Sequence, residues 1–239
     1  MPTTRRLAAA GRPFELSIRE VKQLWWWQRD GAIMTPKIRG QLRHSFGLCP
    51  RHTWAQFAAE CELRGRPFST AILYHDLLGW AAQSLQEAPH RRSSPPPIAA
   101  LQARDGCPTC QWLASSTAPD DPSFAERRQR VNRLERTRGY LAESRPVWTV
   151  RSCPHCLDGQ GLLCRPHLLA ADPASVDADA CAARLLELGE RVSTLVAAMT
   201  VGGPVTRTQD RAALVEALGW CTGWGLVQRL AALPAAGLG

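Results

Sequence analysis

The residues of this sequence best suited to chemistry are four short pairs of cysteine and histidine. Each pair has two residues between its members. In chain order the pairs are Cys49 and His52, Cys107 and Cys110, Cys153 and Cys156, and Cys164 and His167. At this spacing one turn of backbone directs both side chains toward one ion, and three cysteines with one histidine form a closed tetrahedral set for structural zinc. The eight residues therefore predict two zinc sites of the Cys3His type.

The four pairs are of two kinds. The second and third pairs have the form Cys-Pro-x-Cys, which resembles the tight turn of a zinc knuckle. The first and fourth pairs have the form Leu-Cys-x-x-His and precede apolar stretches. This pattern places the two ligands on the first turn of a helix, where the helix dipole favours thiolate. A knuckle combined with a helix start is typical of treble-clef-like zinc sites.

The sequence leaves open which pairs share an ion. A local grouping joins the third pair to the fourth and leaves the first and second pairs for the other site. A crossed grouping joins the second pair to the fourth and the first to the third. The separation along the chain slightly favours the local grouping. In both cases a site links the two halves of the chain.

The elements that must position these ligands are helices. Apolar residues recur at helical spacing over 15–29, 53–63, 70–87, 178–200, 208–218 and 224–232, and Ser17 is a candidate cap for the first helix. An arginine-rich helix is predicted up to about Ser144 and is expected to end at Pro146. Only 147–150 suggests a strand. The predicted fold class is mainly α, with helical halves over 14–90 and 99–233 that form one cooperative unit, joined by a proline-rich linker at 89–97.

The remaining cysteines and histidines are interpreted as structural. Three cysteines lie on apolar helical stretches and are expected in the core. They are Cys61, Cys181 and Cys221. Three histidines are expected at the surface or with satisfied side chains, and a fourth lies on a turn that faces solvent. The three are His44, His75 and His90, and the fourth is His155.

The charge distribution suggests one class of partner. The formal net charge is +8, and basic residues are concentrated in residues 1–66. A basic N-terminal half could follow a nucleic-acid backbone. However, nearly all basic residues are arginine, which indicates a GC-rich coding background, and no nucleic-acid reading motif accompanies them. The nine tryptophans could supply hot spots for a protein partner, although core packing is the more common role.

Composition excludes other classes. Hydrophobic residues make up 45% of the chain, which excludes a disordered protein. No apolar run reaches the ~18 residues of a membrane helix, and none at the N-terminus resembles a signal peptide. We therefore expect a cytoplasmic protein without membrane contact. Because the cytosol keeps thiols reduced, metal binding is favoured over disulfides.

No common catalytic motif is present, since GxSxG, HExxH, GxxxxGK and GxGxxG are all missing. The sequence therefore favours a zinc-binding helical adaptor or binding protein without catalysis of its own. The alternatives are a redox protein, because Cys-Pro-x-Cys also occurs in thioredoxin-type dithiols, an iron–sulfur protein and an open catalytic zinc site.

The stretches SFGLCPRHTW, TAILYHDLL, GCPTC and GLLCRPHLL resemble an uncharacterised family of bacterial, often actinobacterial, helical proteins. Its members repeat CPxC followed by GLCxxH or GFCxxH at a helix start. The resemblance implies a metal-binding helical protein and no particular reaction. This chain departs from the pattern because residues 1–48 contain no cysteine and because Cys153 and Cys156 are additional. If the additional pair replaces the missing one, the resemblance implies the crossed grouping.

Overall fold

The computed structural model describes residues 14–29, 31–87, 96–117 and 119–232. All regular structure in these ranges is helical, which confirms the mainly α prediction. The first five α-helices are α1 (Ile18–Arg29), α2 (Pro36–His44), α3 (Pro50–Arg64), α4 (Phe68–Glu87) and α5 (Pro108–Ser115). The others are α6 (Ala125–Arg133), α7 (Glu135–Trp148), α8 (Pro154–Leu157), α9 (Arg165–Ala170), α10 (Ala178–Ala198), α11 (Thr208–Thr222) and α12 (Gly225–Ala232). Short 3-10 helices cover Ala32–Met34, Pro97–Leu101, Pro122–Phe124 and Pro173–Ser175.

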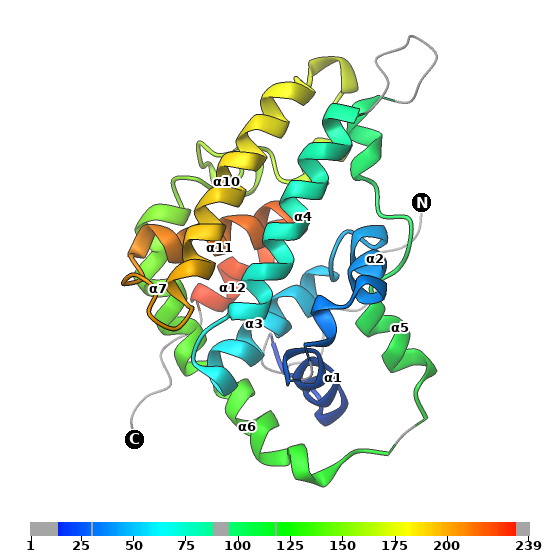
Figure 1. Cartoon of the computed structure of the whole chain (residues 1–239), viewed down its shortest axis with the longest axis vertical. Helices are drawn as coiled ribbons and strands as arrows, with labels where there is room; N and C mark the ends of the chain where they lie inside the picture. Colours follow the sequence, from blue (N-terminus) through cyan, green and yellow to red (C-terminus); the bar gives the residue numbers. More distant parts are fainter. Residues whose placement is uncertain (1–13, 30, 88–95, 118, 233–239) are drawn as a thin grey trace.

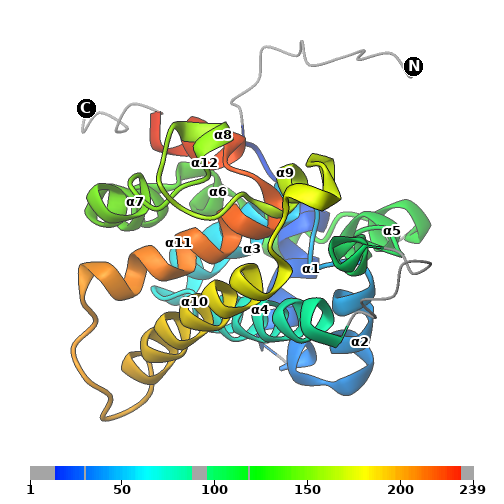
Figure 2. The ribbon, with the colours of Figure 1, turned by 90° about the horizontal axis from the view of Figure 1, so that it is seen from above.

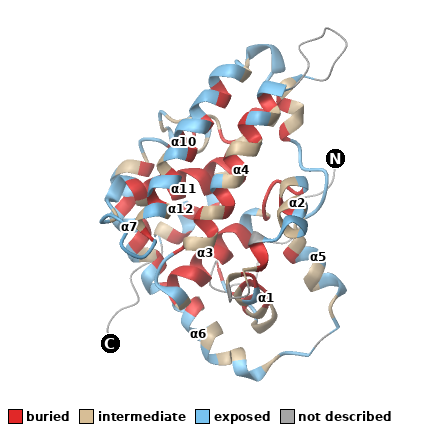
Figure 3. Cartoon of the chain, viewed as in Figure 1, coloured by how far each residue is buried: buried red, intermediate tan, exposed pale blue. Residues whose placement is uncertain are grey.

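Helices α3 and α11 form the centre of the molecule. Both are buried over most of their length and on all sides. Figure 3 shows that the helices around them are exposed on the side that faces away from this centre. Polar residues inside such helices require partners, because an unpaired buried polar group costs about 1–3 kcal/mol. The partners of the α3 carboxylates are described below.

The longest packing contact joins the two halves of the chain. Helices α4 and α10 lie side by side and run in opposite directions (Figure 1). Leu185, Leu188, Val192 and Leu195 recur at helical spacing on α10 and are buried. This spacing forms one apolar stripe along the helix. The first half therefore packs against the second over the full length of α4.

Two acidic residues of α3 cap the N-termini of other helices. The Glu60 carboxylate accepts hydrogen bonds from the backbone N–H groups of Ser69 (2.9 Å) and Thr70 (2.7 Å) in the first turn of α4. The Glu62 carboxylate accepts from the backbone N–H and the hydroxyl of Thr137 at the start of α7, both at 2.8 Å. The first N–H groups of a helix have no partner within it, so these carboxylates satisfy donors that burial would otherwise leave unpaired.

The predicted arginine-rich helix is wrong in two details. It is divided into α6 and α7 at Leu134, whose left-handed backbone (φ 59°) is uncommon for leucine, and whose side chain is buried. In addition, Pro146 does not end α7, because the helix continues to Trp148. The indole of Trp148 is buried and donates to the carbonyl of Leu141 (3.1 Å), which holds the last turn against the core. Residues 147–150 consequently form helix and turn, not a strand.

The other expected helices are present with small changes at their ends. Ser17 caps α1 as predicted: its hydroxyl accepts from the backbone N–H of Glu20 (3.2 Å), and its own N–H donates to the Glu20 carboxylate (2.7 Å). Most of the 89–97 linker lies outside the described residues. None of the described helices has the length and apolar composition needed to cross a membrane. That the two halves unfold as one unit stays a prediction.

Candidate metal centres

All four cysteine and histidine pairs lie at the start of a helix. The first cysteine of each pair is the N-cap residue of α3, α5, α8 or α9, and a proline follows at the first or second helical position. The second ligand of each pair is then the third residue of the helix. Side chains at these two positions meet, as in a capping box. Proline fits the start of a helix because it has no N–H that would need an acceptor. The local sequence thus directs both ligands of a pair to one point.

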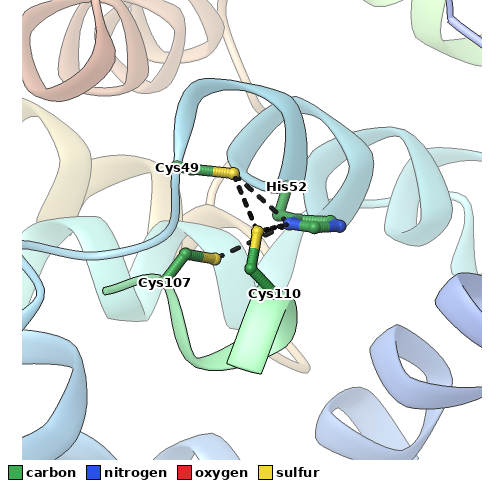
Figure 4. Close-up of side chains that lie close together, drawn as sticks. All are labelled: Cys49, His52, Cys107 and Cys110. Atoms are coloured by element: carbon green, nitrogen blue, oxygen red, sulfur yellow. Dashed lines mark hydrogen bonds between the residues drawn. The ribbon is translucent and has the colours of Figure 1, made fainter. Parts of the chain in front are cut away.

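Site 1 is formed by Cys49 and His52 from α3 and Cys107 and Cys110 from α5 (Figure 4). The Nδ1 atom of His52 lies 3.3 Å from the sulfur of Cys49, 3.6 Å from that of Cys107 and 3.2 Å from that of Cys110. The sulfurs of Cys49 and Cys110 are 3.8 Å apart. His52 is buried, whereas Cys110 is exposed. The site therefore lies at the surface end of α3 and joins the two halves of the chain.

Site 2 is formed by Cys153 and Cys156 from α8 and Cys164 and His167 from α9. The Nδ1 atom of His167 lies 3.4 Å from the sulfurs of Cys153 and Cys156 and 3.3 Å from that of Cys164. The sulfurs of Cys156 and Cys164 are 3.7 Å apart. Figure 2 shows α8 next to α12. This site closes a short loop within the second half.

The donor atoms of both sites are spaced as the corners of a tetrahedron around one ion. With Zn–S and Zn–N bonds of about 2.3 and 2.0 Å, tetrahedral zinc places two sulfurs about 3.8 Å apart and a sulfur and a nitrogen about 3.5 Å apart. The measured separations are 3.7 and 3.8 Å for sulfur pairs, and from 3.2 to 3.6 Å for sulfur and nitrogen. All four donor atoms of each site lie within 4.8 Å of one another. The residues present therefore fit a bound metal ion.

The electrostatics of site 1 also fit a cation. The neighbouring Cys49 sulfur lowers the pKa of Cys107, whereas the Cys107 sulfur and burial raise the pKa of Cys49. Burial raises the pKa of Cys110. Burial and the neighbouring sulfurs thus oppose the loss of protons from Cys49 and Cys110. A metal ion is what allows all three sulfurs to lose their protons, because its charge offsets their mutual repulsion.

Glu20 of α1 orients the histidine of site 1. Its carboxylate lies 3.3 Å from the Nε2 atom of His52, on the side of the ring away from the cysteines. The guanidinium of Arg51 donates to the same carboxylate at 3.0 and 3.3 Å. Burial tends to raise the pKa of Glu20, but hydrogen bonds from His52, Arg51 and the backbone of Ser17 lower it to about 2. Such carboxylate–histidine pairs fix the ring and strengthen it as a metal ligand.

The structure has the local grouping of the pairs. The crossed grouping, which the family resemblance implied, is not the arrangement found. The separation between the third and fourth pairs explains this result, because Cys156 and Cys164 are only eight residues apart and the intervening turn brings α8 and α9 together. The two Cys-Pro-x-Cys pairs, which were expected to form knuckle turns, also begin helices. Helix α8 is a single turn, whereas α5 has eight residues.

The other cysteines and histidines lie where the sequence predicts. Cys61, Cys181 and Cys221 are buried, and His44, His75 and His155 are exposed. His90 lies outside the described residues. The tryptophan run 25–27 is divided as helical geometry requires: Trp27 is buried, whereas Trp26 is 44% exposed. Glu20 was missed as a partner of the site, because no sequence pattern relates it to His52, 32 residues away.

Comparisons of the chain with models of protein families, with curated proteins and with solved structures gave no significant match. The resemblance of its motifs to the bacterial family therefore stays a prediction. Two clusters of three cysteines and one histidine, compatible with metal binding, are what characterise this chain.

Proposed function

We propose that the protein binds two zinc ions in closed Cys3His sites that stabilise its helical fold, and that it acts as a binding or adaptor protein. The observation that carries this proposal is the spacing of the donor atoms: in each site all four lie within 4.8 Å of one another. Zinc is the common metal for tetrahedral sites of three thiolates and one imidazole.

The same spacing favours a single ion over an iron–sulfur cluster. The ligands of a cluster are distributed over several iron atoms. They must therefore lie farther apart than the corners of one small tetrahedron. Four protein ligands also leave no coordination position for water or substrate, which favours a structural role over catalysis. The proposal includes a reducing, cytoplasmic setting, since thiols this close would otherwise form disulfides.

Metal analysis tests the proposal directly. We expect elemental analysis of protein purified without chelators to give about two zinc ions per chain, by the count of complete ligand sets. Replacement by cobalt should give the visible absorption of tetrahedral cobalt thiolate sites. Iron with a visible band in the protein as purified would contradict the zinc proposal and support the iron–sulfur alternative.

A substitution at site 2 tests the structural role. Cys164→Ser removes one ligand, so about one zinc ion per chain should remain and the melting temperature should fall sharply. Cys181→Ser is the matched control, because Cys181 is also buried but lies outside both sites. An unchanged melting temperature in Cys164→Ser would show that site 2 does not stabilise the fold.

A further inference from the structure

Most arginines of the described chain have a carboxylate or carbonyl partner. Arg43 pairs with Asp76, Arg51 with Glu20 and Arg191 with Glu216. Several others form no ion pair with any described residue, and five of these lie at the end of α3, on α6 or at the start of α7. One of the five, Arg127, donates a hydrogen bond to the Ser123 carbonyl but pairs with no carboxylate. These five, which we call the arginine face, are Arg64, Arg127, Arg130, Arg133 and Arg136.

Contacts place three of the five arginines close together, and helical spacing places the other two next to them. Arg64 and Arg127 approach the same ring, that of Trp25, from α3 and α6. Arg136 extends to the turn after α3, where its guanidinium lies beside Gly65. Arg130 and Arg133 follow Arg127 at intervals of three residues, so they lie on neighbouring parts of α6. Figure 1 shows α6 beside the ends of α1 and α3.

Aromatic rings hold two of these arginines in place without neutralising them. The guanidinium carbons of Arg64 and Arg127 are 4.3 and 5.0 Å from the centroid of the Trp25 ring, and that of Arg127 is 5.1 Å from the centroid of Phe124. Stacking on a ring orients a guanidinium and leaves its N–H donors free for hydrogen bonds in the plane. Because Arg64 is exposed, the face of its guanidinium group that points away from Trp25 is accessible to a ligand.

Few acidic groups offset this charge. Glu126 and Glu135 are the exposed acids of α6 and the first turn of α7. Glu62, near the end of α3, points inward to Thr137. Glu15 lines a surface hollow with Arg133, but its carboxylate is paired with Arg128. The five arginines of the face therefore outnumber the acids near them that have no other cation. A surface with this excess of charge attracts a polyanion, and fixed guanidinium groups match phosphate oxygens in geometry.

We propose that the arginine face binds single-stranded nucleic acid. The four arginines of the face on α6 and α7 contact successive phosphates, and the accessible face of the Arg64 guanidinium stacks on a base, a contact available only where bases are unpaired. This proposal goes beyond the role of the metal sites and does not depend on their occupancy, since neither site contains a residue of the arginine face.

The test is fluorescence anisotropy with a labelled twenty-nucleotide oligouridine, using the zinc-loaded full chain. Four phosphate contacts on a single strand predict a slope of about −2.8 in a plot of log affinity against log salt, or an approximately 50-fold loss of affinity between 50 and 200 mM salt. The double variant Arg130→Gln with Arg133→Gln should reduce the slope by about 1.4 and weaken binding at least tenfold at 50 mM salt. Both residues are exposed, so far-ultraviolet circular dichroism and melting should not change.

The matched control is the double variant Arg184→Gln with Arg229→Gln, which removes two exposed arginines of α10 and α12. It should bind as tightly as the parent. An equal loss in both double variants would overturn the proposal, because net charge alone would then explain binding. So would the absence of a complex at 50 mM salt, equal affinity for a duplex of the same length, or equal affinity for polyglutamate, which would indicate an acidic protein as the partner.

Discussion

Glu20 provides a test of site 1 that leaves site 2 as an internal reference. The side chain belongs to α1 and is not itself a candidate ligand, but it is the hydrogen-bond partner of the His52 Nε2 atom at 3.3 Å. With Nδ1 on the metal, Nε2 carries the proton and donates it to the carboxylate. In Glu20→Gln the amide oxygen can still accept this hydrogen bond, but the negative charge that strengthens the imidazole is lost.

The expected effect follows from the kind of contact removed. Loss of an outer partner of a metal-binding histidine typically weakens metal binding about 10- to 100-fold, which corresponds to about 1.4 to 2.8 kcal/mol. Glu20→Gln should fall near the lower end of this range because an acceptor remains. Glu20→Ala should fall near the upper end, since it also leaves Arg51 and the Ser17 N–H without their partner.

The assay is competition for zinc by a chromophoric chelator, followed as two release steps. Among the described residues, no side chain forms a hydrogen bond with the outer nitrogen of His167 in site 2. The Glu20 variants should therefore lower the zinc affinity measured in the step that belongs to site 1 and leave the affinity in the other step unchanged. Glu15→Gln is the matched control, because Glu15 pairs with Arg128 and does not contact His52. If both steps shift equally, or if neither shifts in Glu20→Ala, the assigned role of Glu20 is wrong.

Three further predictions concern the helices that hold the sites. Glu62→Ala should lower the free energy of unfolding by about 2–4 kcal/mol in urea titrations, because the Thr137 N–H and hydroxyl lose a buried acceptor; a loss below 0.5 kcal/mol would be inconsistent with capping. Burial raises the pKa of Glu60, so the native state binds its proton more tightly than the unfolded chain, and this contribution to stability is complete below about pH 4.5 and is lost as pH rises through the raised pKa. The free energy of unfolding of the parent minus that of Glu60→Gln should therefore decrease with rising pH in that window. A difference that does not change with pH would refute the raised pKa of Glu60. Gly219→Ala should destabilise by about 1–3 kcal/mol, since its Cβ would lie 2.6 Å from the Trp224 ring; an unchanged melting temperature would show that the ring can move aside.

The sequence predicted the features that depend on neighbouring residues. Helical periodicity located α4 and α10, and Ser17 followed by Glu20 located the start of α1. The four ligand pairs also depend on local geometry, because residues at the start of a helix three positions apart meet whatever surrounds them. Which pairs combine was left open, since that choice depends on how α3 and α5 pack.

The features that were missed depend on distant contacts. The break at Leu134 is stable because the side chain is buried and because Glu62, far away in the chain, caps the next helix. Helix α7 passes through Pro146 because Trp148 packs into the core. The contact between Glu20 and His52 crosses from α1 to α3. No single sequence reveals such pairs, because each is set by tertiary packing.

The positions of the ligands along the chain have a consequence for biosynthesis. All ligands of site 1 lie before residue 111, whereas α10, the main packing partner of α4, begins at Ala178. During translation, the chain up to Cys110 therefore carries a complete set of metal ligands long before the ribosome releases the helix that covers α4. A zinc ion bound at that stage would keep α3 and α5 together while the apolar side of α4 is still uncovered. Metal supply during synthesis would then influence the yield of folded protein as well as its stability once folded.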